Sequence, residues 1–169
     1  MHNNPDLLLA TKLAYKPNGL FYKNLIAETE SQEYGACSFE INDQHIKFRV
    51  AKITPTKIGQ FVTFWKRIGS GPIEPYDVLD PFDLLVISVR DGEFFGQFVF
   101  PKSILSAKGL LSKETRGGKR AMRVYPPWNT TTSEQARKTQ LWQITYFFEI
   151  HPNKCTDHVR FQSLFNSKG

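Results

Sequence analysis

The chain has 169 residues, of which 40% are hydrophobic and 22% are charged, a composition that is typical of a globular protein and argues against disorder outside the chain ends. Its 22 Lys and Arg residues exceed its 16 Asp and Glu residues and give a net charge of +6. A basic chain of this kind favours polyanionic partners, such as nucleic acid, over polycationic ones.

The length predicts a single domain at residues 1–169, in which residues 1–17 form an N-terminal helix or arm and residues 151–169 form a C-terminal tail. Two cysteines are too few for a disulfide framework and fit a reducing compartment. The N-terminus has an apolar run of only four residues, which does not fit a signal peptide, and no other run is long enough to cross a membrane. We therefore expect a cytoplasmic protein without a membrane partner, and the sequence leaves the oligomeric state open.

Apolar periodicity and turn residues predict helices and strands that follow one another along the chain. Helical spacing or a helix start signal predicts helices at 5–15, 19–30, 54–67 and 101–109, another from Thr132, and a last one near 159–165 that frays. Alternation or a short apolar run predicts strands at 34–41, 45–53, 82–89, 94–100, 121–125 and 142–150. Short turns join the first two strands, and the next two, into hairpins. This order predicts the α/β or α+β class, with a mixed central β-sheet flanked by helices.

The predicted helix at 54–67 matters most for function. Thr54 offers an N-cap hydroxyl, and Pro55 suits the first helical position. Apolar residues then recur at the spacing of one buried helical face: Ile58, Phe61, Val62 and Trp65. We therefore expect the polar residues between them to lie on the exposed face of this helix.

Residues 47–67 carry six cations and no carboxylate. Within them, Lys52 closes an apolar row of its strand. One interpretation is that its ammonium simply reaches solvent at the strand end. The other is that Lys52 points at an anion held by the free N–H groups of the next helix. In that case Lys57, Gln60 and Arg67 share the exposed helix face and contact a phosphate backbone.

A second basic cluster surrounds a pair of glycines, Gly117 and Gly118, which give the loop flexibility. A flexible basic loop can follow a nucleic-acid backbone, so Lys119, Arg120 and Arg123 are further candidate phosphate contacts. The alternative is a solvated loop whose charge serves only solubility.

Motifs of common enzyme classes are absent from the sequence. It contains no GxSxG, Walker or GxGxxG motif, and its four histidines lack zinc-ligand spacing. The residues by themselves therefore predict no cofactor and no metal site.

Several segments resemble the MepB family, a family of small bacterial proteins with no established activity. The likeness covers roughly residues 18–150. The segments that carry it are KFRVAKITPTKIGQFVTFWKR, DPFDLLVISV, FGQFVFPKSILSAKGLLS, GKRAMRVYPPW and QARKTQLWQITYFFEI.

A more distant likeness is to the PD-(D/E)XK nucleases, and it implies a restriction-endonuclease-like core. In those enzymes two acids hold Mg²⁺ and a lysine assists attack on phosphate. The resemblance implies that Glu40 stands for the first acid and Lys52 for the lysine. Val50 occupies the place of the second acid, where an isopropyl group offers a metal ion neither charge nor oxygen ligands.

Together these resemblances imply a MepB-like protein that binds nucleic acid, with DNA favoured, through a degenerate nuclease-like site. One alternative is an active metal-dependent nuclease in which Glu40 and Lys52 are catalytic and a displaced acid completes a Mg²⁺ site. Another is a module that binds a protein or a small ligand without nucleic acid.

Overall fold

The computed structural model describes residues 4–166, so residues 1–3 and 167–169 of the predicted domain lie outside the described residues. The helices are α1 (Pro5–Ala10), η1 (Thr11–Tyr15), η2 (Lys16–Asn18), η3 (Gln32–Tyr34), α2 (Lys102–Ala107), α3 (Glu134–Gln143), η4 (Ile144–Tyr146) and α4 (His158–Phe165). The strands are β1 (Lys23–Ala27), β2 (Cys37–Ile41), β3 (Gln44–Val50), β4 (Lys52–Ile53), β5 (Gln60–Thr63), β6 (Trp65–Arg67), β7 (Ile73–Pro75), β8 (Leu84–Asp91), β9 (Phe94–Pro101), β10 (Ser112–Lys113), β11 (Arg116–Gly117), β12 (Ala121–Val124) and β13 (Phe147–Glu149). Within residues 4–166, no helix has the length and apolar character needed to cross a membrane.

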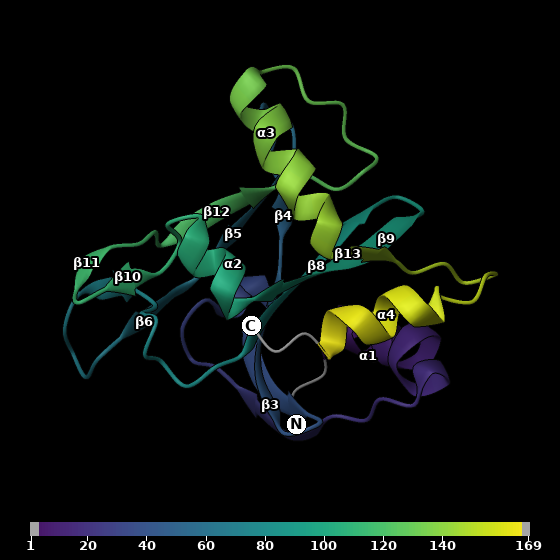
Figure 1. Cartoon of the computed structure of the whole chain (residues 1–169), viewed down its shortest axis with the longest axis horizontal. Coiled ribbons are helices and arrows are strands. Elements are labelled where there is room, and N and C mark those ends of the chain that lie inside the picture. The colour runs from purple at the N-terminus through teal and green to yellow at the C-terminus, as the bar shows by residue number, and fades with distance from the viewer. Residues whose placement is uncertain (1–3, 167–169) are drawn as a thin grey trace.

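A six-stranded sheet forms the centre of the molecule, in the order β1-β2-β3-β8-β9-β13. The pair β3 and β8 is parallel, and the other neighbouring pairs are antiparallel. Figure 1 shows α1 and α4 side by side on one side of β13, with α3 extending away on the other. The predicted mixed central sheet with flanking helices is therefore confirmed.

The central strand β8 is buried on both faces and divides its side chains between two hydrophobic cores. Leu84 and Val86 face the core that is shared with α1, η1 and α4. Leu85 and Ile87 face the core that is shared with α2, β5 and β12. A strand covered on both faces has a nearly continuous apolar sequence, and this is why the sequence predicted β8 correctly.

Both predicted hairpins are confirmed, since β2 pairs with β3 and β8 pairs with β9 in antiparallel register. The turn between β2 and β3 consists of Asn42 and Asp43, whose φ angles are 50° and 63°. Positive φ at both central residues is the geometry of a tight hairpin turn, and Asn and Asp tolerate it better than most residues.

The predicted helix at 54–67 is wrong: residues 54–59 form a turn, and β5 and β6 follow it. From residue 60 onward burial alternates, with Gln60, Val62 and Phe64 buried and Phe61, Thr63 and Trp65 half-buried. Phe61 and Trp65 lie on one face of the chain and Val62 on the other, so the helical period of these apolar residues was misleading, and the β-branched and aromatic residues of the segment favour a strand. Pairing with β12 selects the strand.

Two further predicted elements are wrong in type. The predicted helix at 19–30 is the edge strand β1, which pairs with β2 and contains Asn24 at a φ of 56°. The predicted strand at 142–150 is reduced to β13, because α3 continues through Gln143 and η4 follows it.

The predicted helices at 101–109 and near the C-terminus are confirmed as α2 and α4. The helix predicted from Thr132 begins one residue later than expected, since Ser133 Oγ caps it by accepting from Ala136 N at 3.1 Å. Phe161 and Phe165 of the C-terminal helix are fully buried against α1 and the central sheet, and the fraying of this helix stays a prediction.

The two cysteines differ in exposure, since Cys37 is buried in β2 and Cys155 is exposed. Burial, and to a smaller degree the Glu28 carboxylate, raises the pKa of the Cys37 thiol to about 12. We therefore expect iodoacetamide at pH 8 to modify Cys155 alone in the folded protein and both thiols in denaturant, as measured by intact mass. Equal modification rates for the two thiols in the folded protein would contradict this burial.

The raised pKa of Cys37 also has a consequence for stability at high pH. The folded protein favours the neutral thiol, so this contribution to stability is fully present below the ordinary thiol pKa of 9.0 and is lost as the pH rises toward 12. We expect the loss of melting temperature between pH 9 and pH 11 to be smaller in Cys37→Ala than in the wild type. An identical pH dependence of the melting temperature in both proteins would count against the raised pKa of Cys37.

Candidate nucleic-acid interface

A three-stranded sheet, in the order β12-β5-β4, lies beside the central sheet and carries the candidate site. One of its faces, which includes Val62 and Val124, is buried in the second core. The opposite face, which includes Phe61 and Thr63, is half-buried. Directly paired residues of antiparallel strands point to the same side of a sheet. The partners of Phe61 therefore lie with it on this outer face.

Lys52, Phe61 and Arg123 form a row across the outer face, because Phe61 pairs with Lys52 on β4 and with Arg123 on β12. The Tyr34 ring lies beside this row, 4.7 Å from Lys52 Nζ and 6.2 Å from the Phe61 ring, measured to ring centroids. Burial, followed by the Glu33 carboxylate, raises the pKa of Tyr34 above its ordinary value. Lys52 and Arg123 therefore flank Phe61, and the Tyr34 ring lies next to Lys52 and Phe61.

The turn at residues 54–59 adds a third cation. Arg123 fixes this turn, since Nη2 donates to Thr54 Oγ1 at 3.0 Å and Nη1 donates to Ile58 O at 3.2 Å. Lys57 lies between these two contacts and is exposed. We refer to Tyr34, Lys52, Lys57, Phe61 and Arg123 together as the cationic strip.

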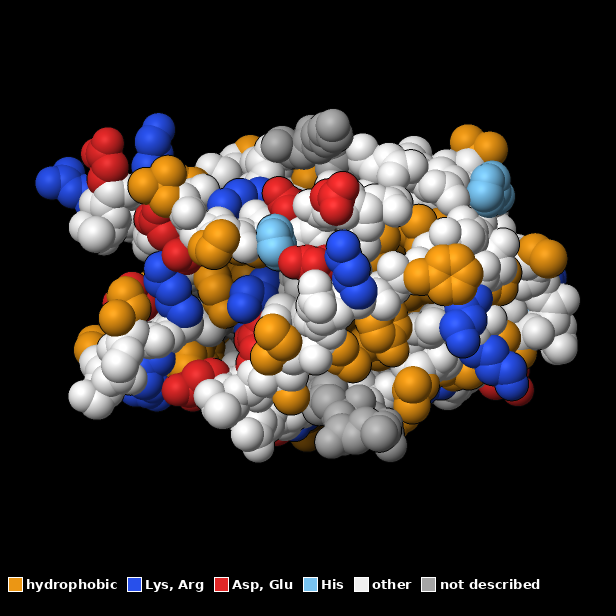
Figure 2. All heavy atoms as spheres, turned by 90° about the horizontal axis from the view of Figure 1, so that it is seen from below, with side chains coloured by type: hydrophobic (Ala, Val, Ile, Leu, Met, Phe, Trp, Pro, Cys, Tyr) orange, Lys and Arg blue, Asp and Glu red, His pale blue; other side chains and the backbone are white. Residues whose placement is uncertain are grey.

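The strip differs from the other cations of residues 47–67 in its charge balance. Four of those six cations form ion pairs with carboxylates from elsewhere in the chain: Lys47 and Arg49 with Glu28, Lys66 with Asp80, and Arg67 with Glu30. Figure 2 shows such neighbouring basic and acidic side chains on one face of the molecule. Among residues 4–166, no ion pair links Lys52, Lys57 or Arg123 to a carboxylate. The uncompensated charge of the segment is therefore at Lys52 and Lys57.

Two predicted nucleic-acid contacts, Gln60 and Arg67, lie in other environments than the helix prediction implied. Gln60 is only 2% exposed, and its Nε2 donates to Arg90 O at 3.2 Å. Arg67 donates from Nε to Glu30 Oε1 at 3.0 Å and from Nη1 to Gly71 O at 2.8 Å. Strand alternation turns Gln60 into the core, and an ion pair engages Arg67, so neither belongs to the strip.

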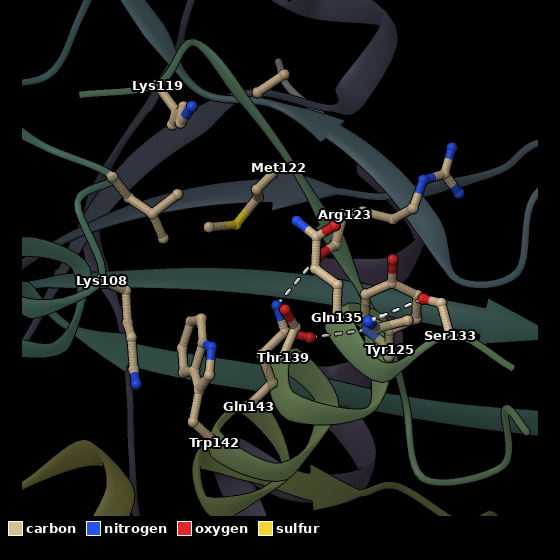
Figure 3. Close-up of a pocket in the computed structure, with 13 residues that line it drawn as sticks. Lys108, Lys119, Met122, Arg123, Tyr125, Ser133, Gln135, Thr139, Trp142 and Gln143 are labelled. Carbon is tan, nitrogen blue, oxygen red and sulfur yellow. Dashed lines mark hydrogen bonds between the residues drawn. The ribbon is translucent and has the colours of Figure 1, made fainter. Parts of the chain in front are cut away.

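The predicted basic loop is divided between two sides of β12. Lys119 and Arg120 are exposed where the chain enters this strand, and Arg120 O accepts from Phe64 N at 2.9 Å. Lys119 lines a pocket between β12 and α3, whereas the Arg123 guanidinium points away from that pocket (Figure 3). The Arg123 side chain thus belongs to the strip, whereas Lys119 and the Arg123 backbone line the pocket.

The structure does not bring together Glu40 and Lys52, the predicted catalytic pair. Glu40 pairs with His45 near the start of β3, whereas Lys52 follows the end of β3. Lys52 follows His45 by seven positions of nearly extended chain, a span of about 23 Å. Glu40 Oε2 instead accepts from Asn24 Nδ2 at 2.8 Å. Within the described part of the chain, no three His, Cys, Asp or Glu side chains are grouped so that they could hold a metal ion.

Sequence analysis missed the aromatic members of the strip. It placed Phe61 on a buried helical face and treated Tyr34 only as part of a strand. Burial alternates from Gln60 to Trp65, but apolar and polar residues do not, so the usable signal for a strand was the β-branched and aromatic content of this segment. The partners across that strand were not predictable from local pattern, because Lys52 and Arg123 are 71 positions apart in the printed sequence.

The fold and the strip define a mixed α and β protein with an open cationic sheet face. A family model described as MepB-like matches residues 28–149. A solved structure described as "Crystal Structure of MepB" is similar at 36% sequence identity and a TM-score of 0.76, and the match covers 90% of this chain and 99% of that chain. No curated protein gives a significant match. The chain belongs to the MepB-like family, as its resemblance to that family predicted.

Proposed function

We propose that the cationic strip binds nucleic acid as a single strand, with DNA as the first candidate. The observation that carries this proposal is the row of Lys52, Phe61 and Arg123, in which two cations without a carboxylate partner flank an aromatic ring. Single strands bind where cations contact successive phosphates and aromatic rings stack on the bases. The strip supplies both kinds of group on one open sheet face.

A single strand suits this surface better than a duplex. The bases of a duplex are already stacked on one another, whereas a single strand exposes base faces that can stack on Tyr34 and Phe61. Adjacent strands lie about 4.8 Å apart, so the backbones at Lys52 and Arg123 are roughly 10 Å apart across β5. That spacing fits a short stretch of one strand lying across the sheet.

The proposal contains no metal-dependent cleavage, because Glu40 and Lys52 lie at opposite ends of β3. The likeness to PD-(D/E)XK nucleases stays a hypothesis about the central sheet. Cleavage of DNA that depends on Mg²⁺ and is lost in Lys52→Ala would favour the nuclease alternative. A nucleic-acid ligand also agrees with the predicted cytoplasmic location.

The salt dependence of binding tests the proposal. We expect a fluorescently labelled single-stranded DNA to bind with an affinity that falls steeply as NaCl increases, measured by fluorescence anisotropy. Each phosphate contact on single strands contributes about 0.7 to the slope of log K against log salt, so Lys52→Ala with Lys57→Ala should flatten the slope by about 1.4. Both side chains are exposed, and their replacement leaves the core unchanged.

Lys138→Ala is the matched control, because Lys138 is a 74% exposed cation on α3 that pairs with Glu134. It should leave the slope at its wild-type value. Binding that is absent, independent of salt, or equally reduced in the control and in the double variant would refute the proposal.

The stacking role of Phe61 makes a separate prediction. Base stacking on an aromatic side chain is worth about 1 to 3 kcal/mol, so Phe61→Leu should weaken DNA binding by roughly tenfold at every salt concentration. The slope against salt should stay unchanged, because no charge is removed. A variant that binds as tightly as the wild type would show that no base stacks on Phe61.

A further inference from the structure

A pocket of about 400 Å³ lies between β12 and α3, within the usual size range of small-ligand sites. Figure 3 shows Met122 of β12 and Trp142 of α3 among its lining residues, with the Arg123 guanidinium directed away from it. The pocket thus shares the Arg123 backbone with the cationic strip but none of the charged or aromatic side chains of the strip. We propose that it binds a nucleotide, meaning a flat heterocyclic base that carries phosphate.

The floor of the pocket is an open stretch of the β12 edge. Arg120 O bonds to β5, so the backbone groups of Ala121 and Arg123 point away from β5. At one end of this edge Lys119 N donates to Leu110 O at 3.1 Å. At the other end Gln143 Nε2 donates to Arg123 O at 3.0 Å. Between these two contacts, Ala121 N–H, Ala121 C=O and Arg123 N–H have no partner among residues 4–166.

This short edge selects a small planar ligand. A donor and an acceptor that lie side by side on one strand match the hydrogen-bonding edge of a heterocyclic base. An added peptide strand would have to continue in both directions, but Leu110 closes the edge at one end and Gln143 closes it at the other. The open groups therefore favour a base over an extended peptide.

The walls of the pocket suit the faces of such a ring. The Trp142 indole and the Met122 thioether both line the pocket, one from each wall. An indole stacks on flat rings, and a polarizable thioether makes favourable contacts with them. The Trp142 ring is held in place by Phe100, whose centroid lies 5.3 Å away. One base could be held between these two side chains.

The charge of the pocket selects an anion. Lys108 and Lys119 both line it, and no Asp or Glu is among its described lining residues. Lys108 Nζ lies over the Trp142 ring, 5.6 Å from its centroid. A base that stacks on this face displaces the flexible lysine side chain, and the ammonium then lies beside the base. A phosphate attached to that base can reach the ammonium groups. The pocket combines a strand edge that can bind a base, an indole that can stack on it and two cations that can bind its phosphate. This combination favours a nucleotide over other anions.

Titration calorimetry of the full chain tests the inference, with AMP, GMP, CMP and UMP as probes. We expect at least one of them to bind, with the matching nucleoside and inorganic phosphate alone each binding about tenfold or more weakly, because each lacks one of the two recognised parts. The backbone amide signals of Ala121 and Arg123 should shift in NMR spectra on addition of that nucleotide.

Two variants remove the proposed contacts without touching the core. Lys108→Ala with Lys119→Ala should weaken nucleotide binding by about tenfold or more, since both side chains are exposed and carry the charge. Ala121→Pro removes the open N–H but keeps the pairing with β5, because that N–H points away from β5. It should weaken binding by about tenfold.

Lys52→Ala is the control, and it should leave nucleotide binding unchanged because Lys52 lies on the strip. A short oligonucleotide, with and without a 5′-phosphate, distinguishes two sources of the ligand. Binding of a free nucleotide indicates that the pocket takes free nucleotides. Binding of the 5′-phosphorylated oligonucleotide alone indicates that it takes the end of a strand. The inference is overturned if neither probe binds, if the pocket variants bind as the wild type does, or if Lys52→Ala abolishes binding. The inference does not depend on DNA binding by the strip. If that proposal fails, only the salt titration of DNA binding is affected.

Discussion

Replacing Glu28 by Ala is expected to lower the free energy of unfolding by about 3 to 5 kcal/mol, because it leaves a buried guanidinium without its counterion. Arg49 is fully buried, and its Nη2 lies 2.8 Å from Glu28 Oε2. The same carboxylate accepts from Lys47 Nζ at 2.8 Å. For a chain of this size the loss corresponds to a melting temperature lower by roughly 10 °C, measured by calorimetry.

Glu30→Ala is the matched control for this prediction. Glu30 forms a similar ion pair with Arg67, but the two side chains are 39% and 35% exposed. Exposed pairs contribute at most about 1 kcal/mol, so this variant should melt close to the wild type. Adding Arg49→Met to a Glu28→Leu background should recover most of the stability, because an apolar pair replaces the buried ion pair. Equal melting temperatures for Glu28→Ala and Glu30→Ala would show that the burial of Arg49 needs no counterion.

Replacing Gly59 by Val is expected to cost about 3 kcal/mol, because backbone strain and a steric clash add together, and to weaken DNA binding at the cationic strip. Gly59 has a φ of 85°, which a β-branched residue adopts only with strain. An added Cβ would lie 2.7 Å from the Tyr125 ring and 2.8 Å from Val124 O. The backbone oxygen belongs to the strand pair and cannot move aside without disturbing β12. The turn that holds Lys57 must therefore shift, and the contact of Arg123 with Ile58 O would be lost.

Gly69→Val separates the two causes, because Gly69 has a φ of 58° and open space around its added Cβ. It shares the backbone strain of Gly59→Val without the steric clash, so it should cost about 1 to 2 kcal/mol and leave DNA binding unchanged. Chemical denaturation and fluorescence anisotropy on both variants measure the two effects. Comparable losses in stability and no loss of binding for Gly59→Val would show that this turn does not shape the strip.

The parts of the fold that sequence analysis predicted correctly are those whose environment is uniform along the chain. The strand β8 is covered on both faces, so its continuous apolar run indicates a strand whatever its partners are. The hairpin turn at Asn42 and Asp43 depends on the conformational tolerance of those two residues, which is a local property. The family resemblance, which rests on many short segments, was also confirmed.

The errors fall where local pattern fits two structures equally. Residues 58–65 have apolar residues at a helical period, but they are also rich in β-branched and aromatic residues that favour a strand, so their structure is decided by pairing with the strand β12 about 60 residues later. The first residues of the predicted strand at 142–150 are helical. Gln143 ends α3, and from there its Nε2 donates to Arg123 O and its Oε1 accepts from Tyr125 N, which stabilises the helix against β12. Tertiary contacts override weak local propensity in both places.

The sequence by itself determined the amount of charge in residues 47–67, the apolar strands of the central sheet and the family of the chain. The tertiary structure alone decided which of those charges remain open, because the carboxylates that neutralise Lys47, Arg49, Lys66 and Arg67 come from other parts of the chain. It also decided that Lys52 and Arg123 flank one aromatic ring. Charge is a property of each residue, whereas compensation of charge depends on distances across the fold, and those distances are set only when distant strands pair.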